Sequence, residues 1–240
     1  MIDIHSHIIP FVDDGSKTLE DSKKMLESAY KAGITKIVLT PHYIEGKYIK
    51  TKQEIAFEIN RLESIKNELG YNNIELIQGN EIMVDANSVG LLENGNLSTI
   101  NNTKYVLIEF SLTFKPCNIE MIIQSFLDSD FIPIIAHPER YLYVQKDISF
   151  IEKCVEYGAL TQMNINSIDG SYGKEAKKTV IKLLKKDLIH TWGSDVHFFR
   201  DSYSNLDKCF KKVIKTVRKK DKYNKILFEN SNKIINNYEI

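Results

Sequence analysis

Apolar and polar positions along the chain form two alternating patterns: short apolar runs, and longer segments with apolar residues at helical spacing. The apolar runs predict β-strands, the first burying Ile2 and Ile4 and the others spanning residues 34–39, 74–77, 105–110, 132–136, 160–165 and 188–192. The helical segments span about residues 18–33, 52–69, 119–127, 148–157, 174–186 and 205–218, with a short one starting near Asn230. Strands that alternate with helices indicate βαβ units around a parallel sheet.

Local signals mark the ends of several predicted helices. Thr18 followed by Asp21 is a helix start of the capping-box type, and Gly33 ends that helix. In the short C-terminal helix, Ile234 and Ile235 are expected to face inward. Residues 87–103 are rich in turn-forming types, so no element is predicted there.

The number of units bears on the architecture. About seven βαβ-type units fit within the 240 residues. That number favours a closed or nearly closed α/β barrel over two smaller domains. No linker rich in Gly, Ser or Pro interrupts the chain, so we expect residues 1–240 to form a single domain.

Composition excludes several function classes. Lys plus Arg equals Asp plus Glu, 32 against 32, which gives no global argument for binding nucleic acid or a membrane. The three cysteines are far apart and form no CxxC, as expected for reduced thiols. We see no signal-peptide pattern and no apolar run of membrane-spanning length. A cytoplasmic protein without stable membrane insertion is expected, and a homo-oligomer is compatible with the sequence.

One segment departs from the even charge distribution. Residues 208–225 carry nine basic residues against a single aspartate. These alternate with apolar residues such as Phe210 and Val213, a pattern typical of a solvated outer helix face. The alternatives are a surface for an acidic protein tail or for an anionic membrane.

Two histidines at the start of the chain introduce the candidate chemistry. His5 and His7 are two residues apart, so in an extended chain both imidazoles lie on one side. Imidazole is a common ligand of transition metals. An isolated HxH pair is more often incidental, so the remaining strand ends decide its meaning.

Further candidate ligands follow the predicted strands. Ionisable residues at the carboxyl ends of barrel strands share one crevice. With the opening pair, the set is His5, His7, His42, Glu81, Glu109, His137, Asp195 and His197. His190, by contrast, falls inside a predicted strand and is interpreted as structural.

The composition of this set indicates its chemistry. Nitrogen and oxygen ligands without a thiolate suit zinc, manganese or iron. Eight ligands exceed the need of one ion, so we expect two or three divalent ions, with Glu81 able to bridge a pair. Paired metals of this kind serve phosphoryl displacement. Arg140, three residues beyond His137, has the geometry to hold a phosphate oxygen.

The successive motifs resemble those of a known superfamily. They are Asp3-Ile-His5-Ser-His7, Thr40-Pro-His42, Gly79-Asn-Glu81, Ala136-His-Pro-Glu-Arg140 and Gly193-Ser-Asp195-Val-His197. Together they resemble the PHP (polymerase and histidinol phosphatase) superfamily. The Val12-Asp-Asp14-Gly15 loop, with the later HPER and SDxH motifs, is similar to the CpsB/YwqE-type bacterial tyrosine-protein phosphatases. The similarity runs nearly from end to end.

This resemblance implies a distorted (β/α)7 barrel with a trinuclear metal centre, often dependent on manganese. It implies that His5 and His7 share one metal with Glu81 and Asp195. Glu109 and His137 would serve a second metal, and His42 and His197 a third. Asp14 would be a ligand or a proton-transfer group there, and Arg140 would contact phosphate.

Two positions depart from the pattern of the family. Many members have glycine or aspartate where this chain has Phe11. A second arginine usually follows the SDxH motif by several residues, whereas Arg200 lies only three beyond His197. Arg200 is therefore interpreted either as a substitute or as an ordinary surface residue.

The function that the resemblance implies is metal-dependent hydrolysis of phosphotyrosine. The expected partner is an autophosphorylated bacterial tyrosine kinase with a tyrosine-rich tail that controls capsule or exopolysaccharide synthesis. One alternative is a phosphatase of small phosphomonoesters such as histidinol phosphate, and another is a metal-stabilised regulatory module without catalysis. A PHP domain serving nucleic acid is a third, for which the basic segment is the only support.

Overall fold

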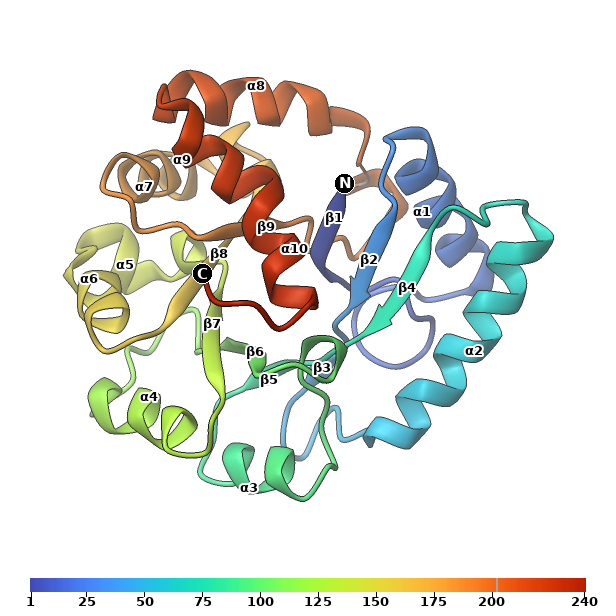
Figure 1. Cartoon of the computed structure of the whole chain (residues 1–240), viewed down its shortest axis with the longest axis horizontal. Coiled ribbons are helices and arrows are strands. Elements are labelled where there is room, and N and C mark those ends of the chain that lie inside the picture. The colour runs from blue at the N-terminus through green and yellow to red at the C-terminus, as the bar shows by residue number, and fades with distance from the viewer. Residues whose placement is uncertain (202) are drawn as a thin grey trace.

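The computed structural model describes residues 1–201 and 203–240, and its strands alternate with helices as predicted (Figure 1). The strands are β1 (Ile2–Ser6), β2 (Lys36–Leu39), β3 (His42–Tyr43), β4 (Glu75–Gln78), β5 (Glu81–Met83), β6 (Tyr105–Glu109), β7 (Ile132–Ala136), β8 (Leu160–Asn164) and β9 (Thr191–Gly193). All pairings between these strands are parallel. Figure 1 shows the helices arranged as a ring around the strands.

The strands close into a distorted barrel of two sheet sections. One section has the order β1-β2-β4 and the other β3-β5-β6-β7-β8-β9. The chain passes from the first section to the second twice, through Thr40–Pro41 between β2 and β3 and through Gly79–Asn80 between β4 and β5. Each of these pairs acts as one interrupted strand, which gives a barrel of seven strands.

The ends of this barrel meet beside β1. Ser6 and Val196 form a parallel bridge, and the His7 backbone N–H donates to the Val196 carbonyl at 3.0 Å. The Asp195 N–H donates to the His5 carbonyl at 2.9 Å. The closed α/β barrel is thereby confirmed.

The helices connect the strands on the outside of the barrel. They are α1 (Leu19–Lys31), α2 (Lys52–Glu68), α3 (Ser88–Glu93), α4 (Ile119–Leu127), α5 (Leu142–Lys146), α6 (Ser149–Glu156), α7 (Lys174–Lys185), α8 (Leu206–Val217), α9 (Lys220–Asn224) and α10 (Asn230–Ile235). Short 3-10 turns lie at Ile100–Asn102, Pro138–Arg140, Ile165–Ile168, Phe199–Asp201 and Tyr203–Asn205, and a π-helical turn at Lys225–Glu229.

Side-chain caps mark the starts of α1 and α2. The Thr18 hydroxyl accepts a hydrogen bond from the Asp21 N–H, as predicted, and Gly33 takes the left-handed φ of +74° after α1. At α2 a full capping box joins Thr51 and Glu54. Both caps therefore satisfy backbone N–H groups in the first turn of their helix.

Two apolar clusters form the core. The larger lies between the sheet and the surrounding helices. The smaller contains Ile4, Val38 and Tyr105 from barrel strands together with Ile234 and Ile235 of α10. The predicted inward orientation of those two isoleucines is confirmed, because α10 covers the amino-terminal end of the barrel (Figure 1).

Some predicted boundaries were wrong. Residues 87–103, left without an element, contain α3 and a 3-10 turn. The last strand, β9, starts at Thr191, three residues after the predicted start at Leu188. His190 therefore lies just before the strand and not inside it. No helix among the described residues is both long enough and apolar enough to span a bilayer.

His190 has a structural role that is sensitive to pH. Burial lowers its pKa to about 4, and the Thr161 N–H donates to its Nδ1 at 3.1 Å, which requires an unprotonated Nδ1. The folded pKa lies below the unfolded value near 6.5, so this contribution to stability is present above pH 6.5 and is lost as pH falls towards 4. Allowing for partial exposure, the loss is about 2 kcal/mol.

A substitution isolates this effect. His190→Asn keeps an acceptor near the position of Nδ1 but does not titrate. We expect the free energy of unfolding by urea to fall less between pH 6.5 and 4.5 in this variant than in the parent protein. Equal losses in the two proteins would show that other groups carry the pH dependence.

Candidate metal centre

The predicted ligand residues lie on or just after the barrel strands, except Asp14, which lies on the loop between β1 and α1. His5 lies within β1 and His7 directly after it, and the register of β1 against β2 shifts between Asp3 and Ser6. Irregularities of this kind re-aim side chains beside functional sites. His42 and Glu81 each begin a short second half-strand, which is why the interruptions at Thr40–Pro41 and Gly79–Asn80 matter for the site.

One group of four side chains is fully buried. It contains His5, His7, Glu81 and Asp195, which offer ligand atoms close enough to hold one ion. Nε2 of His5 lies 3.1 Å from Oε2 of Glu81 and 3.3 Å from Oδ1 of Asp195. Nε2 of His7 lies 3.2 Å from the same Glu81 oxygen.

A second group shares Glu81. Nδ1 of His42 lies 3.1 Å from Oε2 of Glu81 and 3.0 Å from Oε1 of Glu109. Nε2 of His137 lies 2.8 Å from the other Glu81 oxygen and 3.9 Å from Oε2 of Glu109. The two oxygens of Glu81 thus face different histidines, as a bridging carboxylate would.

A third group lies towards the surface. Asp14, His42 and His197 approach one another there, with Oδ1 of Asp14 3.5 Å from Nε2 of His42 and 3.3 Å from Nε2 of His197. His7 completes this group, and its ring stacks on that of His197 at 4.0 Å between centroids. The Asp14 side chain is about half exposed, so it lies at the open side of the cluster.

The outer hydrogen bonds fix which ring nitrogens face the centre. Nδ1 of His5 lies 2.8 Å from Oε1 of Gln162, whose amide nitrogen donates to the Met163 carbonyl. Nδ1 of His7 lies 2.7 Å from Oδ2 of Asp13. In the neutral rings both Nδ1 atoms therefore donate, so the two Nε2 lone pairs face each other across 3.0 Å. A cation between them relieves that repulsion.

Unpaired polar atoms point to the same conclusion. Within the described residues, the buried atoms without a hydrogen bond include Oδ1 of Asp14, Nδ1 of His42, Oε2 of Glu81 and Oδ1 of Asp195. Buried polar atoms normally have partners. All four belong to the three groups, so the donor set fits divalent cations.

The charges in the cluster are strongly coupled. Burial lowers the pKa of His5, but the carboxylates of Glu81 and Asp195 outweigh it and raise that pKa to about 9. Burial also lowers the pKa of His42, but the carboxylates of Glu81 and Glu109 outweigh it and raise that pKa to about 10. Burial would raise the pKa of Glu81, yet the neighbouring imidazoles hold it well below its usual range. The Glu81 carboxylate thus remains ionised, as a metal ligand must be.

Arg140 reaches the same centre. Its Nη1 donates to Oδ2 of Asp195 at 2.5 Å, and its guanidinium lies 4.8 Å from the centroid of the Tyr172 ring. Burial lowers its pKa, but Asp195 raises it further, so the group stays charged. The side chain is about one quarter exposed, which leaves guanidinium N–H groups accessible to an anion.

The backbone is strained at two site residues. His137 has φ of +34° and Asp195 has φ of +53°, in the left-handed region that side chains with a Cβ rarely adopt. Such conformations persist where the surroundings determine them. Glu139 helps to hold the backbone in place after β7. Its fully buried carboxylate accepts hydrogen bonds from the Asn164 N–H and the Ser167 hydroxyl.

Two glycines lie directly beneath the opening histidines. A Cβ at Gly15 would lie 2.4 Å from Cβ of His7, and a Cβ at Gly193 would lie 2.4 Å from Cβ of His5. Neither distance is tolerable for two carbon atoms. The two imidazoles can occupy their positions only because these sites carry no side chain.

Several residues that support the site were not predicted. Asp13 holds the His7 ring, Gln162 the His5 ring, and Asn164 donates to Oδ2 of Asp195 at 2.6 Å. Gln162 and Asn164 are two residues apart in a strand, so their side chains lie on one face of the sheet. That spacing was the sequence pattern from which they could have been predicted. For Asp13 no pattern distinguished it from its neighbour Asp14.

The two residues that depart from the family pattern, Phe11 and Arg200, are both exposed. Phe11 is 62% exposed and has φ of +65°, so an aromatic side chain is displayed in a strained loop. Arg200 lines a cavity of about 70 Å³ together with Lys17 and His197. Arg200 therefore lies beside the third ligand group, and Arg140 beside the first.

Asp13 provides a test of the outer hydrogen bonds. Its Oδ2 accepts from both the His7 ring and the His42 N–H, while Oδ1 accepts from the Gly15 N–H. Asp13→Asn puts an amide N–H against one of these donors. We expect metal affinity to fall about 10- to 100-fold. Metal titration of the purified variant measures this, and Asp128→Asn on the exposed end of α4 should leave affinity unchanged.

Comparison with known proteins places the chain among bacterial relatives. The family model for capsular polysaccharide synthesis proteins, CpsB/CapC, matches residues 1–236. The tyrosine-protein phosphatase CpsB of Streptococcus agalactiae is 30% identical over 245 residues, covering 100% of both chains. The tyrosine-protein phosphatase YwqE of Bacillus subtilis is 35% identical over 199 residues, covering 82% of this chain and 77% of that protein.

A solved structure agrees with the fold throughout. It comes from work on YwqE of Bacillus subtilis and CpsB of Streptococcus pneumoniae, described there as metal-dependent tyrosine phosphatases. The TM-score is 0.93 at 30% sequence identity, with 100% of this chain and 96% of that chain covered. The likeness therefore includes the carboxyl ends of the strands where the ligand groups lie.

Proposed function

Because the chain belongs to the CpsB/CapC family of capsular polysaccharide synthesis proteins, we propose that it is a metal-dependent protein-tyrosine phosphatase. One observation carries this proposal beyond the family match. Nine ligand residues and Arg140 converge at one end of the barrel. The arrangement suits hydrolysis of a phosphate ester.

The three ligand groups define where metal would bind. We propose two or three divalent ions, with manganese as the expected metal and iron or zinc as alternatives. The ligands would be His5, His7, Asp14, His42, Glu81, Glu109, His137, Asp195 and His197. When bound, such ions supply Lewis-acid stabilisation of phosphoryl oxygens and activate water near neutral pH.

The protein's own groups would position the substrate. Arg140 is anchored by Asp195, so its free N–H groups are held ready for a phosphate oxygen. Asp14 lies at the open side, and the neighbouring imidazoles of His197 and His42 hold its pKa below the usual range. An ionised Asp14 there serves as a ligand and can accept a proton from water. Phenolate is a comparatively good leaving group, so strong acid assistance is not required.

The cysteines support a mechanism without a thiol nucleophile. Burial raises the pKa of Cys154 to about 12 and that of Cys209 to about 11, so neither forms a thiolate at neutral pH. Cys117 is exposed and lies before α4, lining a separate apolar groove. None belongs to the ligand groups.

The substrate and setting follow from the proposed activity. We propose that residues 1–240 act as one phosphatase domain in the cytoplasm. The expected substrate is an autophosphorylated tyrosine kinase with a tyrosine-rich tail, in a pathway of capsule synthesis.

Two assays test this function. A phosphotyrosine peptide and histidinol phosphate are compared as substrates, before and after chelation and after thiol alkylation. We expect preference for the peptide, loss of turnover on chelation and no effect of alkylation. Preference for histidinol phosphate would favour a small-molecule phosphatase, and no turnover of either by the metal-loaded protein would favour a regulatory module. Full activity after verified metal removal would contradict the mechanism.

A further inference from the structure

A second cavity lies at the opposite end of the barrel from the ligand groups. It has a volume of about 310 Å³, within the range of small-molecule sites. His190 lines it and directly precedes β9, whereas Asp195 and His197 follow the other end of that strand. Asp195 lies five residue steps of nearly extended chain beyond His190, a span of roughly 16 Å.

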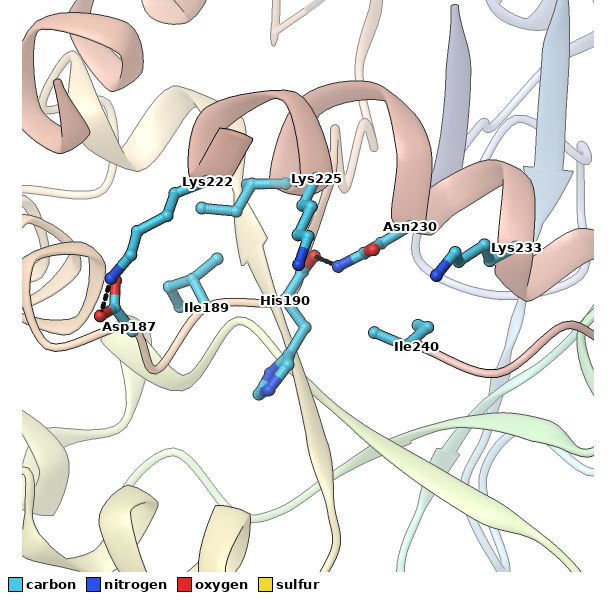
Figure 2. Close-up of a pocket in the computed structure, with 9 residues that line it drawn as sticks. Asp187, Ile189, His190, Lys222, Lys225, Asn230, Lys233 and Ile240 are labelled. Atoms are coloured by element: carbon cyan, nitrogen blue, oxygen red, sulfur yellow. Dashed lines mark hydrogen bonds and ion pairs between the residues drawn. The ribbon is translucent and has the colours of Figure 1, made fainter. Parts of the chain in front are cut away.

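The cavity presents several positive groups. Figure 2 shows Lys222, Lys225 and Lys233 along the segment that runs from α9 to α10. Lys222 is paired with Asp187 across the opening. Lys225 and Lys233 have no ion pair or hydrogen bond to any described residue, so two ammonium groups remain uncompensated beside the cavity.

His190 adds a neutral donor to this set. Because its Nδ1 accepts from the Thr161 N–H, the proton of the neutral ring is on Nε2. No acceptor for that N–H is found in residues 1–201 or 203–240. The Asn230 side-chain N–H donates a hydrogen bond to the His190 carbonyl at 2.8 Å, which joins these two lining residues. The cavity thus has donors in excess of acceptors.

The remaining lining is apolar. Ile189, Ile226 and Ile240 contribute side chains, and Figure 2 shows Ile189 and Ile240 on opposite sides of His190. A hydrated inorganic ion would leave these groups without contact. A ligand with both an anionic head and a compact apolar group satisfies the donors and the isoleucines together.

We propose that this cavity is a binding site for a small organic anion, with a phosphate- or sulfonate-type head towards Lys225, Lys233 and His190 and an apolar group against the isoleucines. The site is separate from the metal centre. The site uses Lys225 from the basic segment of residues 208–225. Other lysines of that segment, Lys208 and Lys212 on α8, form ion pairs with Asp169 instead.

The chain contains its own reporter for occupancy. Trp192 is the single tryptophan, is fully buried and lies two residues after His190. Its indole N–H donates to the Leu227 carbonyl at 3.0 Å, next to the cavity residue Ile226. A ligand that moves the Lys225–Glu229 turn therefore changes Trp192 fluorescence.

The test titrates the metal-loaded protein with cyclohexanesulfonate, which a phosphatase cannot hydrolyse, and with sulfate and cyclohexanol separately. We expect a saturable change in Trp192 fluorescence with cyclohexanesulfonate and weaker or no saturation with the other two. The variant K225E/K233E should weaken binding at least about tenfold. The matched variant K211E/K215E, with the same charge change on exposed positions of α8, should bind within about twofold of the parent.

Further variants keep the test decisive. K225Q/K233Q replaces the double glutamate variant if that protein does not fold, and should also weaken binding. His190→Asn removes the Nε2 donor and should weaken binding about fivefold. Phosphatase activity should be unchanged in all of these variants. Absence of saturation, equal weakening by both glutamate pairs, or sulfate binding as tightly as cyclohexanesulfonate would overturn the proposal.

Discussion

Replacing Glu81 by glutamine is expected to lower kcat/KM for a phosphotyrosine peptide by at least about a thousandfold, or roughly 4 kcal/mol of transition-state stabilisation. The reason is the position of this carboxylate. Its two oxygens contact His5, His7, His42 and His137, so it belongs to more than one ligand group. Glutamine keeps the size of the side chain but removes the negative charge and one acceptor.

Metal analysis separates this explanation from misfolding. The purified Glu81→Gln protein should have lost bound metal while it keeps a cooperative thermal transition. Glu45→Gln is the matched control, because Glu45 is an exposed carboxylate near β3 that accepts a hydrogen bond from the Tyr43 hydroxyl. Parent-like activity and metal content in Glu81→Gln would show that Glu81 is not a shared ligand.

Replacing Arg140 by alanine is expected to lower kcat/KM about 100- to 1,000-fold, as for the loss of a preorganised group that stabilises developing charge. Arg140→Lys should recover part of the activity, since it keeps the charge without the planar fork. Measuring kcat and KM separately shows whether the contact is stronger in the transition state than in bound substrate. Metal content should be measured too, because Arg140 neutralises the ligand Asp195.

Arg200 is the natural control for this experiment. It is exposed beside His197, and the sequence alone left its role open. If Arg140 holds the phosphate, Arg200→Ala should change kcat/KM by less than about threefold, the range of an ordinary surface residue. A loss in Arg200→Ala equal to that in Arg140→Ala would assign phosphate binding to both arginines.

The barrel and the convergence of the ligands could be predicted because each depends on local patterns. Apolar runs mark the strands, and the residue just after a run is at the shared end of the barrel. His137 and Asp195 are examples, since His137 follows β7 directly and Asp195 lies two residues after the end of β9. The short strands β3 and β5 were missed because two or three residues after Pro41 or Asn80 carry too little pattern to be recognised.

The support of the ligands could not be predicted in the same way. Gln162 belongs to β8, 157 residues from the histidine that it orients, and only the closed barrel brings them within 2.8 Å. The strained φ of His137 and Asp195 is likewise invisible in a sequence. His190 was expected inside a strand, whereas the structure places it just before β9, at the wall of a cavity.

The glycines beneath His5 and His7 have a consequence for how this centre could vary or be transplanted. Gly70 and Gly46 have positive φ and open space around them, so an asparagine could replace either at small cost. Gly15 and Gly193 differ, because even a methyl group there would displace an imidazole. A library of all substitutions should therefore tolerate nothing at these two positions. Grafting the nine ligands onto another barrel would fail unless glycines were also placed at the positions equivalent to Gly15 and Gly193.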